Sequence, residues 1–288
     1  MYRQLEATFL RSIGQHYMRD LTASMSQSQR FLITVGGDQL TGKSTLAQDL
    51  AVAPEVTSVV QGRIALRSTG QTMRDLAAEQ GVEIGQLSST LAQTTVGGTL
   101  NHNNSKAGLV DVNLDYTTCQ GVAGKYEEDA GMLIMEGRQP AVMASFVNEQ
   151  VPGSTQLPFR VYLKCSIREQ ALRYVGREIS ELAREEVEKY LPVGEEYASM
   201  ESVLERIEGK TFAGHDQIIS GFRTNMDRDK DDKQRFDLLY GADCHYRNEF
   251  FYDLVIDTSH IEPKDKVNAV AHGWMDWLVD NNFGVKEV

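Results

Sequence analysis

The 288-residue sequence contains few cysteines, and those present are far apart. They are Cys119, Cys165 and Cys244, and no two of them form a C-x-x-C motif. An odd number of widely spaced cysteines supports neither a disulfide framework nor a zinc site. A protein of the reducing cytoplasm is therefore expected.

Long hydrophobic runs and an excess of positive charge are also missing. No segment approaches the roughly eighteen consecutive apolar residues of a membrane-spanning helix, and the N-terminal residues do not resemble a signal peptide. Lysine and arginine number 29 against 41 aspartate and glutamate residues, which gives a formal net charge of -12. Because nucleic-acid and membrane-surface binders usually present a basic face, neither kind of partner is expected. Any anion site must be a local basic pocket.

Short apolar runs recur along the chain, with longer helical patterns between them. This alternation predicts an α/β fold of three layers, in which a parallel sheet has helices on both faces. The last helical pattern, residues 263–280, places its tryptophans and valines on one side, as a helix covering the sheet would. The five runs expected to form the sheet are residues 31–35, 64–66, 132–135, 161–163 and 254–256.

Two segments lie outside this rhythm. Residues 1 to about 24 carry apolar side chains at spacings of three or four, which predicts one N-terminal helix, followed by a polar linker. We expect residues 1–29 to form this appendage and residues 30–288 the main domain. Residues 178–208 hold ten glutamates, and Pro192 and Gly194 divide them into a predicted acidic helical hairpin.

A glycine-bounded loop follows the first predicted strand directly. Residues 37–44 read GDQLTGKS, and a helical pattern continues from residue 44 to residue 51. The pattern G-x-x-x-x-G-K-[ST] between a strand and a helix is typical of a phosphate-binding loop, or P-loop. The less specific alternative is a tight glycine turn before a helix.

The residue types of this loop suit the phosphates of ATP and its magnesium ion. Gly37 and Gly42 let the backbone curl so that successive N–H groups face phosphate oxygens, beside the positive end of the next helix. Lys43 is expected to reach the β- and γ-phosphates, and the Ser44 hydroxyl to bind Mg²⁺. With Thr45, these residues form the predicted cofactor-binding site for ATP and Mg²⁺.

Further motifs follow the loop in a fixed order. Together with it, they resemble the cytidylate kinase family, particularly its archaeal-type, cytidylate kinase-like branch. The resemblance covers most of residues 30 to 275. Its motifs are STGQTMRDL at 68–76, MEGR at 135–138, RYVGRE at 173–178, residues 228–241 from Arg228 to Gly241, and DLVIDT at 253–258.

The resemblance implies a P-loop nucleoside monophosphate kinase fold with an acceptor-binding region at about residues 69–130 and a lid at about 173–235. It implies a cytoplasmic enzyme that transfers the γ-phosphoryl group of ATP to a nucleoside monophosphate, CMP or dCMP first. It places Thr69, Arg74 and Arg138 against the acceptor and Glu136, with Ser44, at the metal. Arg173 and Arg177 match the lid arginines. Lys43, Arg138, Arg228 and Arg235 are the predicted catalytic residues, because positioning and charge neutralisation dominate phosphoryl transfer.

Each of these assignments has a simpler alternative. Arg173 and Arg177 are four residues apart and could form a solvated helix face, and Arg74 could lie on the outer face of its helix. Arg228 and Arg235 alternate with aspartates, as on a self-neutralising exposed helix. Glu136 could be a surface carboxylate at a strand end.

The acceptor is the least determined part of the prediction. No arginine occurs between Arg74 and Arg138, and Gln139 stands where many relatives have an aspartate. Two alternatives to a nucleoside monophosphate kinase therefore stay open. One is a P-loop kinase of a different small molecule, and the other is a non-enzymatic ATP-binding regulatory module. The N-terminal helix and the acidic insertion are also candidate surfaces for a homodimer.

Overall fold

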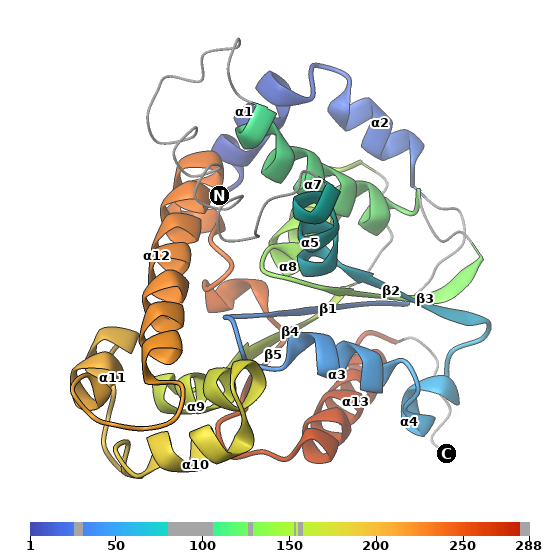
Figure 1. Ribbon diagram of the computed structural model, residues 1–288. Coiled ribbons are helices and arrows are strands. Elements are labelled where there is room, and N and C mark those ends of the chain that lie inside the picture. Colours follow the sequence, from blue (N-terminus) through green and yellow to red (C-terminus); the bar gives the residue numbers. More distant parts are fainter. Residues whose placement is uncertain (26–30, 80–105, 126–128, 153, 155–157, 283–288) are drawn as a thin grey trace.

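A computed structural model of the chain describes residues 1–25, 31–79, 106–125, 129–152, 154 and 158–282 (Figure 1). Its centre is a five-stranded sheet in the order β2-β3-β1-β4-β5, and every neighbouring pair is parallel. The predicted parallel sheet is confirmed, and each strand includes the apolar run predicted for it. The strands are β1 (Phe31–Gly37), β2 (Arg63–Ser68), β3 (Ala130–Glu136), β4 (Pro158–Lys164) and β5 (Leu254–Asp257).

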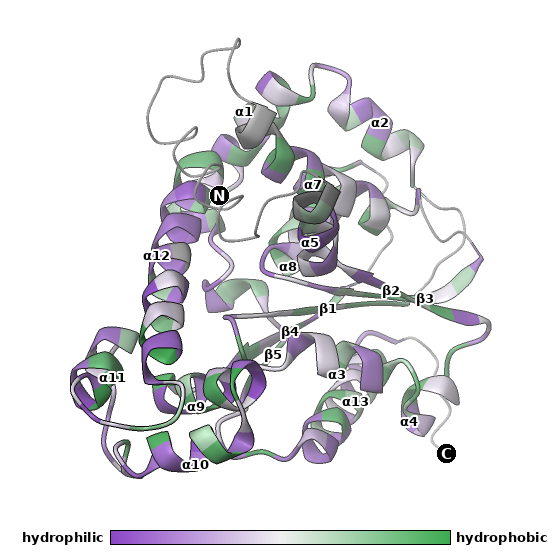
Figure 2. Ribbon diagram, viewed as in Figure 1, coloured by the Kyte–Doolittle hydropathy of each residue, from purple (hydrophilic) through white to green (hydrophobic). Residues whose placement is uncertain are grey.

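Helices cover both faces of the sheet, so the fold has three layers (Figure 1). Successive residues of β3 enter different cores: Leu133 packs with one cluster, and Met132 and Ile134 with the other. This is the period of two that a strand buried on both faces shows. Figure 2 shows the central strands hydrophobic along most of their length, whereas the helices alternate between hydrophobic and hydrophilic residues.

One face carries α3 (Lys43–Leu50), α4 (Pro54–Thr57) and α13 (Pro263–Asp280). Val270, Trp274 and Leu278 of α13 are fully buried against this face, as the pattern of residues 263–280 predicts. The opposite face carries α5 (Thr69–Glu79), α7 (Lys106–Ala123) and α8 (Pro140–Gln150) (Figure 1). The chain between α5 and α7 lies outside the described residues.

The region predicted to be a lid has a small hydrophobic core of its own. It contains α9 (Ile167–Glu178), α10 (Glu181–Glu188), α11 (Met200–Ile207) and the first part of α12 (His215–Tyr240). Pro192 and Gly194 fall between α10 and α11, as the predicted hairpin requires. The long helix α12 then runs from this core toward the N-terminal helices (Figure 1). Two short 3-10 helices, η1 (Ala242–Cys244) and η2 (Glu249–Phe251), connect it to β5.

The prediction of one N-terminal helix is wrong, because two short helices are present. Helix α1 (Arg3–Ser12) ends before Gly14, whose φ of 107° belongs to the left-handed region, and α2 (Tyr17–Ala23) follows. A glycine adopts that conformation readily and interrupts a helix. Phe9 of α1 is fully buried and packs edge-on against Tyr116 of α7. The N-terminal helices therefore share a core with the main body of the protein.

None of the helices in the described part of the chain is long and apolar enough to cross a membrane.

Candidate functional site

A cavity of about 430 Å³ opens at the carboxyl ends of β1 and β3. The chain leaves β1 for α3 on one face of the sheet and leaves β3 for α8 on the other. In open parallel sheets, ligands bind where the connections diverge in this way. The lining includes these predicted site residues: Gly42, Lys43, Ser44, Thr45, Thr69, Arg74, Glu136, Arg138, Arg173, Arg177 and Arg235. A second cavity of about 510 Å³ shares Ser44, Thr69, Arg74 and Glu136 with it.

Two predicted residues are not part of this lining. Gly37 lies at the end of β1, where it shapes the loop from behind: a Cβ there would lie 2.5 Å from the Leu163 carbonyl oxygen, and its φ is 144°. Only glycine fits such a backbone position without strain. Arg228 belongs to α12, but its side chain lies outside the described residues.

The loop of residues 37–44 borders the cavity together with the start of α3. Gly42 has a φ of 90° and caps α3, which begins at Lys43, and no side chain caps this helix end. The first N–H groups of a helix lack partners within the helix and attract anions. The loop therefore offers an uncapped helix N-terminus beside a lysine.

The Lys43 ammonium group lies in an environment that disfavours its charge. Burial, reinforced by the nearby Arg138, lowers the pKa of Lys43 to about 8. Its Nζ donates a hydrogen bond to the Asp38 backbone carbonyl oxygen. An anion in the cavity would favour the charged lysine and raise this pKa again.

Ser44 and Glu136 lie side by side at the edge of the sheet. The Ser44 hydroxyl donates to the Glu136 carboxylate over 3.2 Å, and Ser68 at the end of β2 donates to the same oxygen. Glu136 is 5% exposed, so it is not the solvated surface carboxylate of the simpler alternative. One hydroxyl and one carboxylate suit Mg²⁺, which prefers oxygen ligands and keeps several waters or phosphate oxygens of its own. No cluster of three or more metal-ligating His, Cys, Asp or Glu side chains occurs among the described residues.

Side chains from later parts of the chain support the loop of residues 37–44, and of these the sequence predicts a role for Arg173 but for neither Tyr246 nor Arg247. The Asp38 carboxylate accepts hydrogen bonds from the Tyr246 hydroxyl at 2.9 Å and from Arg247 Nε at 2.7 Å. Both donors follow α12, about 200 residues further along the chain, so no local pattern reveals them. Arg173 of α9 donates to the Leu40 carbonyl oxygen at 3.1 Å and to Thr258 Oγ1 at 3.2 Å. Arg173 therefore connects the lid, the loop and the end of β5.

Arg177 follows Arg173 by one helical turn, and it too lines the cavity. Its guanidinium is largely exposed and donates to Glu178 at 2.6 Å. The alternative of a solvated helix face therefore fits the exposed side chain of Arg177. It does not fit Arg173, which is hydrogen-bonded to the loop and to Thr258.

The opposite side of the cavity begins at the end of β2. Thr69 donates to the Glu136 backbone oxygen at 3.3 Å, and a Cβ on Gly137 would lie 1.9 Å from Thr69 Oγ1. The glycine between Glu136 and Arg138 is therefore required for β3 to pass close to α5. Arg74 is exposed at the cavity rim and donates to the Gln71 side chain at 2.9 Å.

Arg138 and Arg235 are both ion-paired with aspartates of α12. Arg138 contacts Asp229 at 2.9 Å and also pairs with Asp232, while Arg235 pairs with Asp232 and, at 2.6 Å, with Asp111. Asp232 is 2% exposed and Arg235 is 3% exposed. The alternative of a self-neutralising exposed helix is therefore wrong for Asp232 and Arg235, which are buried and line the cavity.

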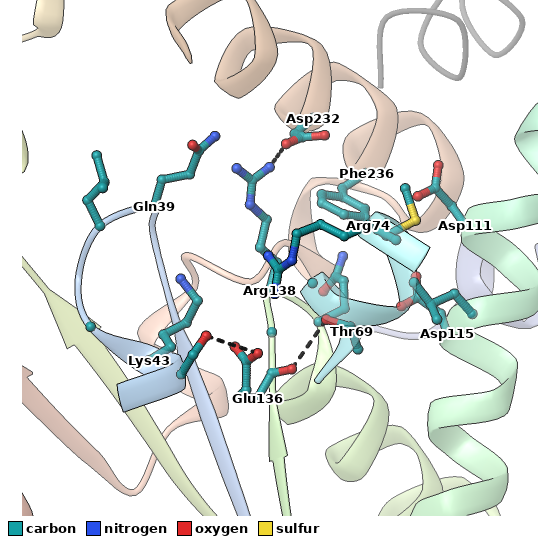
Figure 3. A pocket seen from close by; sticks show the side chains of 18 of the residues that line it. Gln39, Lys43, Thr69, Arg74, Asp111, Asp115, Glu136, Arg138, Asp232 and Phe236 are labelled. Atoms are coloured by element: carbon teal, nitrogen blue, oxygen red, sulfur yellow. Dashed lines mark hydrogen bonds and ion pairs between the residues drawn. The ribbon is translucent and has the colours of Figure 1, made fainter. Parts of the chain in front are cut away.

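Two buried aspartates of α7 complete the cavity wall. Asp111 and Asp115 lie one helical turn apart, and the Tyr240 hydroxyl donates to Asp115 Oδ2 at 2.5 Å. Burial raises the pKa of Asp115 to about 8, and burial also raises the pKa of Asp111 despite the nearby Arg235. Figure 3 shows both aspartates across the cavity from Lys43, with Arg138 between them. Their i,i+4 spacing, which places both side chains on one face of α7, is the sequence signal that could have identified both.

No protein-family model matches this sequence, and no curated protein matches it. Among solved structures, one similar chain is an uncharacterized protein from Eubacterium ventriosum, with a TM-score of 0.44 and 10% identity over 86% of this chain and 99% of that one. Another is described as a "putative kinase" from Chloroflexus aurantiacus, with a TM-score of 0.37 and 14% identity over 87% of this chain and 98% of that one. Similarity this distant does not bear on function.

Proposed function

We propose that this chain is an ATP-dependent phosphotransferase of the P-loop type, with a small-molecule acceptor. The observation that carries the proposal is the pairing of Ser44 with Glu136 at 3.2 Å, next to Lys43 and the uncapped start of α3. A tight glycine turn would explain the loop alone. It would not explain why a buried carboxylate from a separate strand meets the hydroxyl of the same loop.

The residues divide into three tasks. The N–H groups of the loop, with Lys43, hold the phosphates of the donor nucleotide, and Ser44 and Glu136 hold the magnesium ion directly or through water. Bound magnesium supplies charge neutralisation at the phosphate oxygens. Arg138 lies between Lys43 and the buried aspartates, where it can orient the acceptor against the donor (Figure 3). Arg173 connects the lid to the loop, so closure of the lid would exclude water from the transfer.

A nucleoside monophosphate, CMP or dCMP first, is the acceptor that the resemblance implies. Thr69, Arg74 and Arg138 are in place to contact it, since all three line the cavity. The test is an ADP-release assay with purified protein, ATP and Mg²⁺, carried out across the common nucleoside monophosphates. We expect one of them to raise the rate well above the acceptor-free rate. If none does, the monophosphate assignment is wrong.

A specific observation favours a second acceptor class, small molecules without a phosphate. Arg138 and Arg235 already have carboxylate partners, Asp229, Asp232 and Asp111, so less of their charge is free for a phosphate dianion. Including phosphate-free hydroxyl compounds in the same assay would separate the two classes.

A further inference from the structure

The wall of the cavity opposite the P-loop is lined by hydrogen-bond acceptors. Asp111 and Asp115 of α7 lie there, across from Lys43 (Figure 3), and each is 4% exposed. Among the described residues, the hydrogen bond to Asp115 comes from Tyr240 and ends on Oδ2. Oδ1 of Asp115 is therefore available to a ligand that carries a hydrogen-bond donor.

Gln139 gives an independent indication that a ligand binds here. It lines the same cavity and is 2% exposed, yet neither atom of its side-chain amide has a hydrogen-bond partner in the described part of the chain. Leaving a buried amide without hydrogen-bond partners is unfavourable. A ligand with hydroxyl or amino groups would satisfy both the amide oxygen and the amide nitrogen.

Charge complementarity argues against an acidic ligand at this wall. Arg138 and Arg235, which both line the cavity, share the buried Asp232, and Asp111 pairs with Arg235 as well. A phosphate or carboxylate of the acceptor would compete with these carboxylates, and each carboxylate it displaced would remain buried without its partner. Breaking a buried ion pair in this way is strongly unfavourable. A neutral or cationic group meets no such competition.

We propose that the acceptor is a phosphate-free polyhydroxyl or amino-hydroxyl compound, whose far end is bound by Asp111, Asp115 and Gln139. This inference rests on the proposed phosphotransferase function and specifies its substrate class. One hydroxyl oxygen of the acceptor forms the new bond to the γ-phosphorus of ATP, while the bond from that phosphorus to the β–γ bridging oxygen breaks and ADP leaves. The hydroxyl proton is released to solvent water, so atoms and charge balance.

The experiment compares matched compounds that differ by one phosphate. ADP release by the full chain is measured with cytidine and CMP, ribose and ribose 5-phosphate, and glucosamine and glucosamine 6-phosphate. ADP binding is measured separately by calorimetry. We expect at least one phosphate-free member to raise the rate about tenfold or more above the acceptor-free rate and above its phosphorylated counterpart.

The variant Asp115→Asn then tests the residue itself. The amide has nearly the same volume and its oxygen can still accept the Tyr240 hydrogen bond, but the NH2 group that then takes the place of Oδ1 cannot accept a hydrogen bond from the ligand. We expect KM for the active acceptor to rise about tenfold, while the Kd for ADP stays unchanged. Asp276→Asn, the same change at an exposed position of α13, is the control and should alter neither quantity.

The outcomes separate the two proposals. Turnover of CMP or ribose 5-phosphate with no turnover of its phosphate-free counterpart overturns the inference and leaves the phosphotransferase in place. An unchanged acceptor KM in Asp115→Asn also overturns the inference. ADP binding with no turnover of any of the six compounds counts against the phosphotransferase itself, and the inference fails with it.

Discussion

The two halves of the cavity present different chemical groups, mainly backbone in one half and side chains in the other. The half that we propose binds the donor, here called the donor half, consists mainly of backbone: a glycine loop and the uncapped start of α3, with Lys43, Ser44 of α3 and Glu136 at the end of β3. The acceptor half consists of side chains from α5, α7 and α12, and its arginines are held by buried aspartates. Backbone N–H groups suit any polyphosphate, whereas a network of paired side chains suits one particular molecule. The donor half therefore indicates a chemistry, and the acceptor half determines a specificity.

Removing the donor lysine should separate activity from stability most clearly. Lys43→Ala is expected to lower kcat/KM about 10³-fold, because a charge that neutralises the transferring phosphoryl group is lost. The thermal unfolding midpoint should not fall, since the substitution removes a half-buried charge whose partial desolvation is unfavourable. Lys264→Ala, at an exposed position of the first turn of α13, is the control for both measurements. Retained activity in Lys43→Ala would remove the basis for the donor half.

The corresponding change in the acceptor half should act mainly on stability. Arg235→Ala leaves Asp111 and Asp232 buried without their shared partner, which is expected to lower the free energy of unfolding by about 3–5 kcal/mol. Urea denaturation measures it. Arg223→Ala on the same helix breaks an exposed pair with Glu208 and should cost less than about 1 kcal/mol. Equal losses in the two variants would contradict the distinction between the halves.

The backbone origin of the donor half can be tested with a single methyl group. Gly37→Ala would place a Cβ 2.5 Å from the Leu163 carbonyl oxygen at a φ of 144°. We expect a loss of stability of about 2–4 kcal/mol together with weaker ADP binding. Gly194→Ala, which has a φ of 91° but no neighbouring atom within 4 Å of the new Cβ, isolates the conformational cost. It should lose only about 1 kcal/mol, with no effect on ADP binding.

The smallest expected effect is on the pH dependence of stability. Asp115 in the acceptor half and Lys43 in the donor half should contribute slopes of opposite sign to the plot of stability against pH. Asp115 has a folded-state pKa of about 8 against an ordinary value of 3.8. Between these two pH values, the folded protein therefore holds a proton that the unfolded chain has lost. Its contribution to stability should fall as pH rises from about 4 to about 8. The Asp115→Asn variant should lack this decline.

For Lys43, the folded-state pKa is about 8 and the ordinary value is 10.5. The unfolded chain holds the extra proton between these values, so the Lys43 contribution should rise with pH from about 8 to about 10.5. Lys43→Ala should remove that rise and leave the lower range unchanged. The measurement for both is the urea midpoint as a function of pH, and slopes of the same sign would contradict the comparison.

The sheet was predictable because its signal is local. Each strand is a short apolar run, and the P-loop motif follows β1 without a gap, so neighbouring residues carry both signals. The extra helix break at Gly14 was missed, since the apolar spacing continues across it. Roles for Asp111, Tyr246 and Arg247 were missed for a different reason: each acts on residues far away in the sequence.

By itself, the sequence determined the order of elements, the five strands and the glycine loop between β1 and α3, because short-range sterics and hydrophobic periodicity control these features. Only the tertiary structure placed Asp232, Arg235 and Asp111 in one buried network and put Gln139 in the cavity with no hydrogen-bond partner for its side chain among the residues that the structure describes. Burial and ion pairing depend on which helices meet, and the meeting of α7 with α12 is not encoded at any single position. The acceptor site is therefore a product of packing, and the donor site is a product of local sequence.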